Sequence, residues 1–191
     1  MKRNRLQLAV VIVLLISIFM NITCYMRRNE IKREYLDSAY LNLLNVSVLL
    51  SSLEYYVEDS GTEEDRDRVY PIFEALEAEG RRLDDALNVL QRISGSAAQG
   101  GYAVCLVDFR WYMGQYDSKY KTVILSRYKT AVEETIQSLS IGGEILTDGN
   151  GFRIKNPDYS ISTKRIVRLL TDGYGRMNSG DMTLNIPMKA D

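Results

Sequence analysis

Residues 6–25 read LQLAVVIVLLISIFMNITCY, and this stretch of twenty residues contains no charged side chain. As a helix rising about 1.5 Å per residue, it is long enough to cross a hydrocarbon core about 30 Å thick. Twelve of its residues are Leu, Ile, Val or Phe. Each contributes roughly −0.3 to −0.6 kcal/mol to insertion near the bilayer centre. The sequence therefore predicts a transmembrane segment over residues 6–26.

The same stretch begins like a cleaved signal peptide, because Lys2, Arg3 and Arg5 precede an apolar core. However, the residues at 21–24 are Asn-Ile-Thr-Cys, which lack the small side chains expected just before a cleavage site. Cys24 also raises the alternative of a lipoprotein cysteine, but the residues ahead of it match that signal poorly. An uncleaved signal anchor is the favoured interpretation.

The orientation of this anchor rests on its basic flanks. Three basic residues precede it, and four follow closely: Arg27, Arg28, Lys32 and Arg33. The two sides nearly balance under the positive-inside rule. The short basic tail at residues 1–5 resembles the start of a signal sequence, so we expect a cytoplasmic N-terminus. Residues 27–191 would then lie outside the cytoplasm, at the cell membrane.

The composition after the anchor is that of one mixed-charge domain. Of 24 basic residues, 21 follow Met26, as do all 25 acidic residues, so this part carries a formal charge of −4. A mildly acidic chain with both signs interspersed argues against nucleic acid as a partner. No second apolar run approaches the length of a membrane span.

Three long helices are expected from hydrophobic periodicity. The first continues from the anchor to about Asp59, with an a/d seam of Leu36, Ala39, Leu43, Val46, Leu50, Leu53 and Val57. The second follows the N-cap Thr62, with a weak point near Pro71 or Glu79. The third covers roughly residues 98–139. The membrane-proximal seam could pack inside its own domain or against another chain, and we favour packing inside its own domain.

The C-terminal part changes character. Asp148-Gly149-Asn150-Gly151 lies between short β-prone runs and predicts a hairpin near residues 144–155. A short amphipathic helix is expected to end at Gly173, followed by a loose tail over residues 174–191. The expected fold is mainly α, with the transmembrane helix continuing into an antiparallel bundle of three to four helices over residues 27–173.

The residue types present exclude several kinds of catalysis. The chain has no histidine, which removes the commonest general base and metal ligand. Two cysteines without histidine make a zinc site implausible, and the glycine pairs lack the setting of a phosphate loop. Cys105 is expected to be a buried apolar side chain. We therefore expect no catalytic residue, no metal site, no cofactor and no enzymatic activity.

Two groups of residues are candidates for binding. The first is an aromatic face, in which helical spacing brings several rings together, that could line a ligand groove or a partner surface: Tyr55, Tyr56, Trp111, Tyr112, Tyr116 and Tyr120. Core packing is the alternative role for these rings. The second is the basic cluster that follows the anchor, a candidate contact for anionic lipid headgroups: Arg27, Arg28, Lys32 and Arg33.

One anchor followed by a helical domain is similar in architecture to the extracytoplasmic bundles of bacterial chemoreceptors and sensor kinases. It departs from them because no second membrane helix is found in the sequence. The first functional hypothesis is a single-pass, non-enzymatic interaction, scaffold or accessory subunit, with the lipid bilayer and a protein partner or a second copy as its partners. The alternative is an extracytoplasmic small-ligand sensor that uses the aromatic face.

Overall fold

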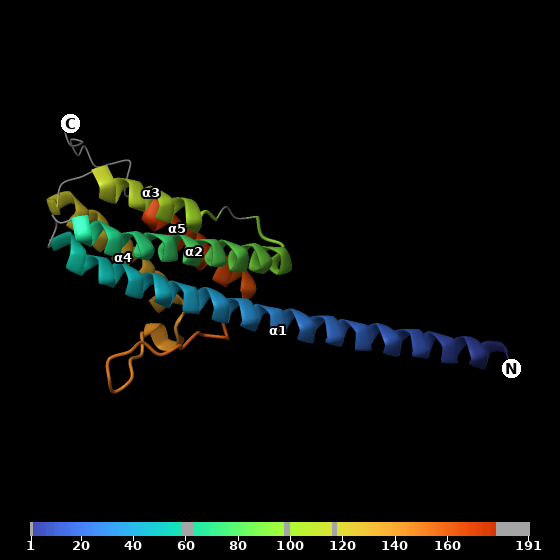
Figure 1. Cartoon of the computed structure of the whole chain (residues 1–191). Coiled ribbons are helices and arrows are strands. Elements are labelled where there is room, and N and C mark those ends of the chain that lie inside the picture. The colour runs from blue at the N-terminus through green and yellow to red at the C-terminus, as the bar shows by residue number, and fades with distance from the viewer. Residues whose placement is uncertain (1, 59–62, 98–99, 116–117, 179–191) are drawn as a thin grey trace. The chain divides into compact units, whose positions relative to one another are not determined.

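A computed structural model describes residues 2–58, 63–97, 100–115 and 118–178. In these ranges the chain is mainly α-helical, as expected from its periodicity, and contains no strand. Figure 1 shows the elements, whose bounds are α1 (Lys2–Glu58), α2 (Glu63–Ser94), α3 (Tyr102–Gln115), α4 (Ser118–Leu139), the 3₁₀ turn η1 (Ile141–Gly143) and α5 (Thr163–Asn178).

The chain divides into two compact units, residues 1–34 and 35–191. The first unit is the N-terminal part of α1, whose apolar side chains from Val10 to Met26 are exposed. One window of 18 residues in α1 is long and apolar enough to cross a membrane, with a mean hydropathy of 2.0, and none of it is buried by protein. The second unit is a helical domain built from the rest of α1 and from α2 to α5.

The helical domain has one apolar core to which all five helices contribute. The predicted seam of α1 is buried from Leu36 to Leu53, while the side chain of Val57 lies outside the described residues. Among the other helices, α5 packs against both α2 and α4, and α3 packs mainly against α2. The largest fully buried side chains are aromatic: Tyr40, Tyr102, Tyr128 and Phe109.

The second predicted helix is a single α-helix that passes through Pro71 and Gly80 without interruption. Gly80 allows α2 to approach α3 closely, because a Cβ atom there would lie 2.9 Å from the Cα atom of Ala103. The Glu79–Gly80 pair is thus explained by helix packing rather than by a weak point in the helix. The predicted cap at Thr62 and stop at residues 60–61 lie outside the described residues.

The prediction of one helix over residues 98–139 is wrong. The structure has two helices in this stretch, α3 and α4, which end and begin on either side of residues 116–117. Both halves keep the predicted buried positions, since Leu106, Phe109 and Met113 are buried on α3 and Ile124 and Tyr128 on α4. Hydrophobic spacing alone did not reveal the break because the apolar positions remain in step on both sides of it.

The predicted hairpin is not supported. Residues 144–155 form a loop with one isolated antiparallel bridge, Thr147–Arg153, in which the Ile154 amide donates to the Leu146 carbonyl at 2.8 Å. Asp148 accepts amide hydrogen bonds from Asn150 and Phe152, so the turn itself forms as its sequence suggests. No flanking sheet is present in the described residues to extend this bridge, and two short strands alone are marginally stable.

The last helix continues five residues beyond the predicted end at Gly173, to Asn178. Gly173 is buried in α5, where the helix passes close to α4 and to the start of α3. A Cβ atom at this position would collide with Thr135 Oγ1 and would lie 2.9 Å from the hydroxyl oxygen of Tyr102. This glycine therefore permits close packing and is no helix stop. Residues 179–191 of the predicted tail lie outside the described residues.

Substitution of two glycines on α5 tests this packing. Gly173→Ala should destabilise the domain by about 1–3 kcal/mol, because the added methyl group has to displace Thr135 or Tyr102 in a filled core. Urea unfolding of the full chain in detergent micelles, followed by circular dichroism, measures this loss.

Gly175→Ala is the matched control on the same helix. Nothing lies within 4 Å of a Cβ atom at Gly175. Alanine should therefore stabilise the helix there by about 0.5–1 kcal/mol. Equal effects at the two positions would contradict the packing role of Gly173.

Candidate functional site

Four of the six aromatic residues predicted as a binding face form two edge-to-face pairs. The ring centroids of Tyr55 and Tyr56 on α1 are 5.5 Å apart, and those of Trp111 and Tyr112 on α3 are 5.2 Å apart, each pair edge to face. Tyr55 is 71% exposed and Trp111 is 52% exposed, whereas Tyr56 and Tyr112 are half-buried. Each pair therefore presents one ring to the outside and anchors it with the other.

Only one of the remaining two aromatic residues lies in the described part of the chain. Tyr120 is half-buried on α4, and Tyr116 lies outside the described residues. The spacing of Tyr112, Tyr116 and Tyr120 defines one helix face only if the helix is continuous, and α3 ends at Gln115. The core beneath is filled by Phe109 and Tyr128, whose ring centroids are 4.6 Å apart. The small-ligand groove stays a prediction.

The outward face of α3 is apolar. Val104, Val107 and Trp111 are 62%, 43% and 52% exposed. Their spacing of three and four residues places them on one side of the helix. The opposite side is already buried through Cys105, Leu106, Phe109 and Met113. Neighbouring apolar residues that stay exposed often mark a contact surface. This outward face, formed by Val104, Val107 and Trp111 and called the α3 face below, is therefore a candidate contact surface.

The borders of the α3 face are charged. Asp108 is exposed and lies within the same arc of the helix as Val104 and Trp111. On the other border, the guanidinium carbon of Arg110 lies 4.6 Å from the centre of the Tyr70 ring on α2. This cation–π contact holds Arg110 against α2. The α3 face therefore combines an apolar centre with an acidic group that a basic partner side chain would complement.

The predicted lipid-contacting residues lie in the first unit, on the part of α1 that follows the apolar window. Arg27, Arg28 and Arg33 are exposed, and Lys32 is half-buried. They occupy less than two helical turns, so their charges lie close together along the helix axis. This arrangement suits contact with anionic headgroups, at about 1 kcal/mol for each residue near the surface. The role of these residues stays a prediction.

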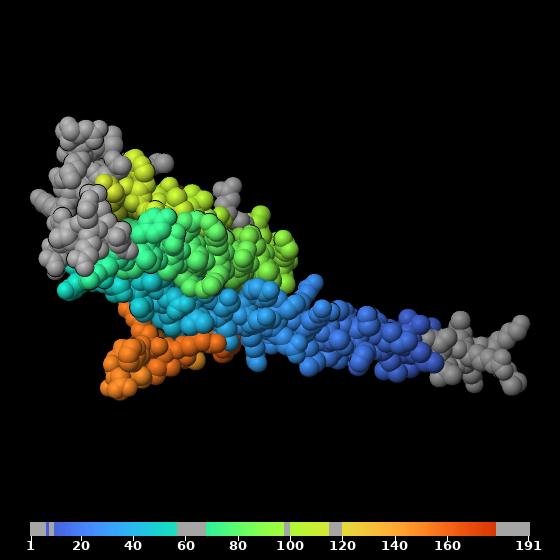
Figure 2. Space-filling model, viewed as in Figure 1, coloured from blue at the N-terminus to red at the C-terminus, as the bar shows by residue number. Residues whose placement is uncertain are grey.

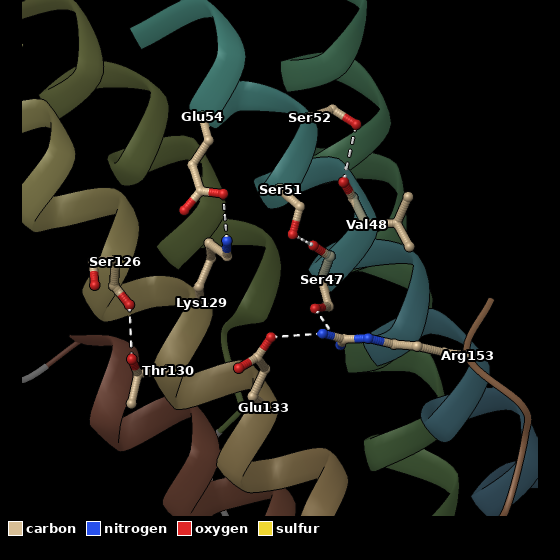
Figure 3. Close-up of polar contacts among 10 residues, drawn as sticks. All are labelled: Ser47, Val48, Ser51, Ser52, Glu54, Ser126, Lys129, Thr130, Glu133 and Arg153. Carbon is tan, nitrogen blue, oxygen red and sulfur yellow. Dashed lines mark hydrogen bonds and ion pairs between the residues drawn. The ribbon is translucent and has the colours of Figure 1, made fainter. Parts of the chain in front are cut away.

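A polar cluster fastens the loop at residues 144–155 to the helical domain (Figure 3). Arg153 donates from one guanidinium nitrogen to the hydroxyl of Ser47 on α1 and from the other to Glu133 on α4, both at 2.6 Å. The ammonium of Lys129 lies 2.7 Å from Glu54, which joins α4 to α1 directly. These pairs are partly exposed, so each contributes at most about 1 kcal/mol. They position the loop against α1 and α4.

Polar groups inside the domain serve the fold. The carboxylate of Asp84 on α2 accepts from the backbone amides of Tyr102 and Ala103, at 2.9 and 3.0 Å, and so caps the first turn of α3. The hydroxyl of Tyr102 donates to the carbonyl of Leu170 on α5 at 2.6 Å. Burial raises the pKa of Tyr102 well above its usual value. Its hydroxyl therefore stays protonated and available as a donor at neutral pH.

The structure brings no recognisable reaction centre together in the ranges that it describes. No group of three or more cysteine, aspartate or glutamate side chains is placed there to hold a metal ion. Cys105 is buried, with its sulfur 3.6 Å from the hydroxyl of Tyr128. A thiol in such apolar surroundings behaves as a small core side chain. What the domain offers for recognition is its exposed surface.

No family model, curated protein or solved structure matches this chain.

Two features of the domain surface, the α3 face and the anchoring of the loop at residues 144–155, were missed by sequence reasoning. The α3 face carries a signal that could have been found, because Val104, Val107 and Trp111 have the spacing of a second apolar stripe on one helix. The anchoring of the loop through Arg153 carries no such signal. Ser47 and Arg153 are 106 residues apart, and only the folded chain shows that they meet.

Proposed function

We propose that this chain is a single-pass, membrane-anchored, non-enzymatic interaction subunit of the cell envelope. The observation that carries the proposal is the α3 face, an exposed apolar surface centred on Trp111 above a core that is already filled. Tryptophan is among the residues most often found at the energetic centre of protein interfaces. The partner inferred from this surface is a protein with an apolar patch and a basic side chain opposite Asp108.

Membrane anchoring is supported by the composition and exposure of the first unit. Its apolar window is unburied in the structure, and large apolar side chains over this length are costly to leave in water. The twelve Leu, Ile, Val and Phe residues at 6–25 are worth roughly −4 to −7 kcal/mol for insertion. In the proposed arrangement the N-terminus is cytoplasmic, and the helical domain acts outside the cytoplasm, beside the lipid.

Two charges in the apolar segment test the anchor. The double variant Leu14→Arg and Ile16→Arg adds a cost of about 5–7 kcal/mol, which is comparable to the whole gain from insertion. The full chain should then move from the carbonate-resistant membrane pellet to the soluble fraction, as measured by immunoblotting of both fractions.

The matched control is Leu14→Val with Ile16→Val, which keeps the segment apolar and should leave the chain in the pellet. Retention of the arginine variant in the pellet would contradict anchoring through residues 6–26. Release of the unmodified chain by carbonate would contradict it as well.

Cysteine labelling tests the orientation. In a Cys24→Ser background, a cysteine at exposed Ser126 on α4 should react with a membrane-impermeant maleimide added to intact cells. Buried Cys105 remains and should not react until the protein is denatured. Labelling of Ser126→Cys only after the cells are lysed would place the domain in the cytoplasm and reverse the proposed orientation.

Truncation of Trp111 tests the partner surface. Capture of the full chain in mild detergent should recover a stoichiometric protein partner, and Trp111→Ala should lower that recovery by about tenfold or more. Trp111 contacts Tyr112 at the surface of the domain and is half exposed, so its removal should leave the core intact.

Val123→Ala is the control for this measurement, since Val123 is 44% exposed and lies on a different helix, α4. It should leave the recovery of the partner unchanged. Recovery of the chain alone, or equal recovery with Trp111→Ala, would overturn the assignment of the α3 face.

A further inference from the structure

A second apolar stripe lies on the outer side of α1 in the helical domain. Leu41, Val48 and Tyr55 are 48%, 56% and 71% exposed. They are spaced by seven residues. Because seven residues take an α-helix to within about 20° of two full turns, the three side chains lie on one side of the helix. They face away from the buried seam formed by Leu36, Leu43, Leu50 and their neighbours. We call these three residues with Asn45 and Ser52 between them the α1 stripe.

We propose that the α1 stripe pairs with the same stripe of a second copy of this chain, in a parallel, two-fold symmetric contact. The proposal rests on the membrane anchoring inferred above, because anchors in one bilayer hold two copies in the same orientation. In a parallel two-fold pair, residues at the same height face each other. Leu41 then meets Leu41 of the second copy, and Val48 and Tyr55 do the same.

The charge pattern supports this occupant. A charged residue on a two-fold seam would face an identical charge, which is unfavourable. No residue of the α1 stripe between Leu41 and Tyr55 is charged. Glu54 is the only charged residue between Leu41 and Tyr55, and it lies outside the stripe and pairs with Lys129 on α4. Asp37, one helical turn before Leu41, pairs with Lys155 of the loop. The α3 face differs, since exposed Asp108 lies at its border.

The polar residues of the stripe fit the same contact. The hydroxyl of Ser52 donates to the carbonyl of Val48 at 3.0 Å, so its hydrogen is used within the helix (Figure 3). The donor of Ser52 therefore stays satisfied when the side chain enters an apolar contact. Asn45 occupies a half-buried position between Leu41 and Val48. A single asparagine on a coiled-coil seam fixes both the parallel register and the two-stranded state.

The edge of the stripe is ordered by its neighbours. Tyr56 holds the ring of Tyr55 edge on at 5.5 Å, which limits the freedom that Tyr55 would lose on pairing. The loop at residues 144–155, which stands out from the surface in Figure 2, is tied to α1 at Ser47 through Arg153 and at Asp37 through Lys155, and it leaves Leu41 and Val48 exposed. From Leu41 to Tyr55 the stripe is only about 21 Å long, so pairing depends on the raised effective concentration of anchored copies.

Disulfide trapping in native membranes tests the proposal. In a Cys24→Ser background, Val48→Cys should form a disulfide-linked homodimer on mild oxidation, since paired positions on such a seam lie within the reach of a disulfide. Val104→Cys on the α3 face is the matched control, with the same residue type and 62% exposure against 56%. The dimer fraction should be at least about fivefold higher for Val48→Cys, because same-height contact favours that site.

A second pair of variants separates pairing from random collision. Val48→Lys places like charges opposite each other and should lower the disulfide dimer formed by Tyr55→Cys by about tenfold, whereas Val48→Leu should preserve it. Position 48 is exposed, so neither change disturbs the core. Equal dimer fractions with Val48→Lys and Val48→Leu would overturn the proposal. An adduct of Val48→Cys with a different protein, in place of the homodimer, would also overturn it.

In the trapping experiment, the disulfide-linked homodimer is measured only in the carbonate-resistant membrane pellet. Homodimers at position 48 in that pellet support pairing, whatever the outcome at Trp111. A chain that stays in the pellet but yields no homodimer overturns the pairing and leaves the anchor intact. A chain that is absent from the pellet contradicts the anchor itself, and with it the parallel arrangement on which this inference depends.

Discussion

The helical domain depends on the burial of one side of α1. Five large side chains of its seam, Leu36, Leu43, Val46, Leu50 and Leu53, are at most 1% exposed. At about 1.5–3 kcal/mol each, their burial amounts to roughly 8–15 kcal/mol before the cost of ordering the chain. That is as large as the net stability of a typical domain. The second half of α1 is therefore an integral part of the core, although the same helix begins as the proposed membrane segment.

Sequence periodicity predicted this core well and the connections poorly. Buried apolar residues recur along the sequence with the period of the α-helix. Leu76, Leu83 and Leu90 on α2 could therefore be assigned to the interior from their spacing alone. The break between α3 and α4 carries no change in that spacing. The continuation of α5 through Gly173 was missed because glycine usually marks a helix end. Here it is required by Thr135 and Tyr102, which lie far away in sequence.

The candidate surfaces were only partly predictable for the same reason. Trp111 and Tyr55 were singled out from the sequence, and both are exposed. Whether an apolar residue faces the core or the outside depends on which sides of its helix are covered by neighbours. Val104 and Cys105 are adjacent on α3, yet one is 62% exposed and the other is buried. Local pattern alone gives both the same apolar character, and only the positions of α2 and α4 distinguish them.

The two exposed apolar surfaces differ in the kind of partner that their chemistry suits. Asp108 lies at the border of the α3 face, and a basic group on a different protein would satisfy it at lower cost than a second copy of the same carboxylate. The α1 stripe has no charge, and its Ser52 hydroxyl is already bonded within the helix. It can therefore face itself without an unfavourable pair. In the proposed arrangement one helix joins two copies of the chain, and another helix on each copy remains available for a different protein.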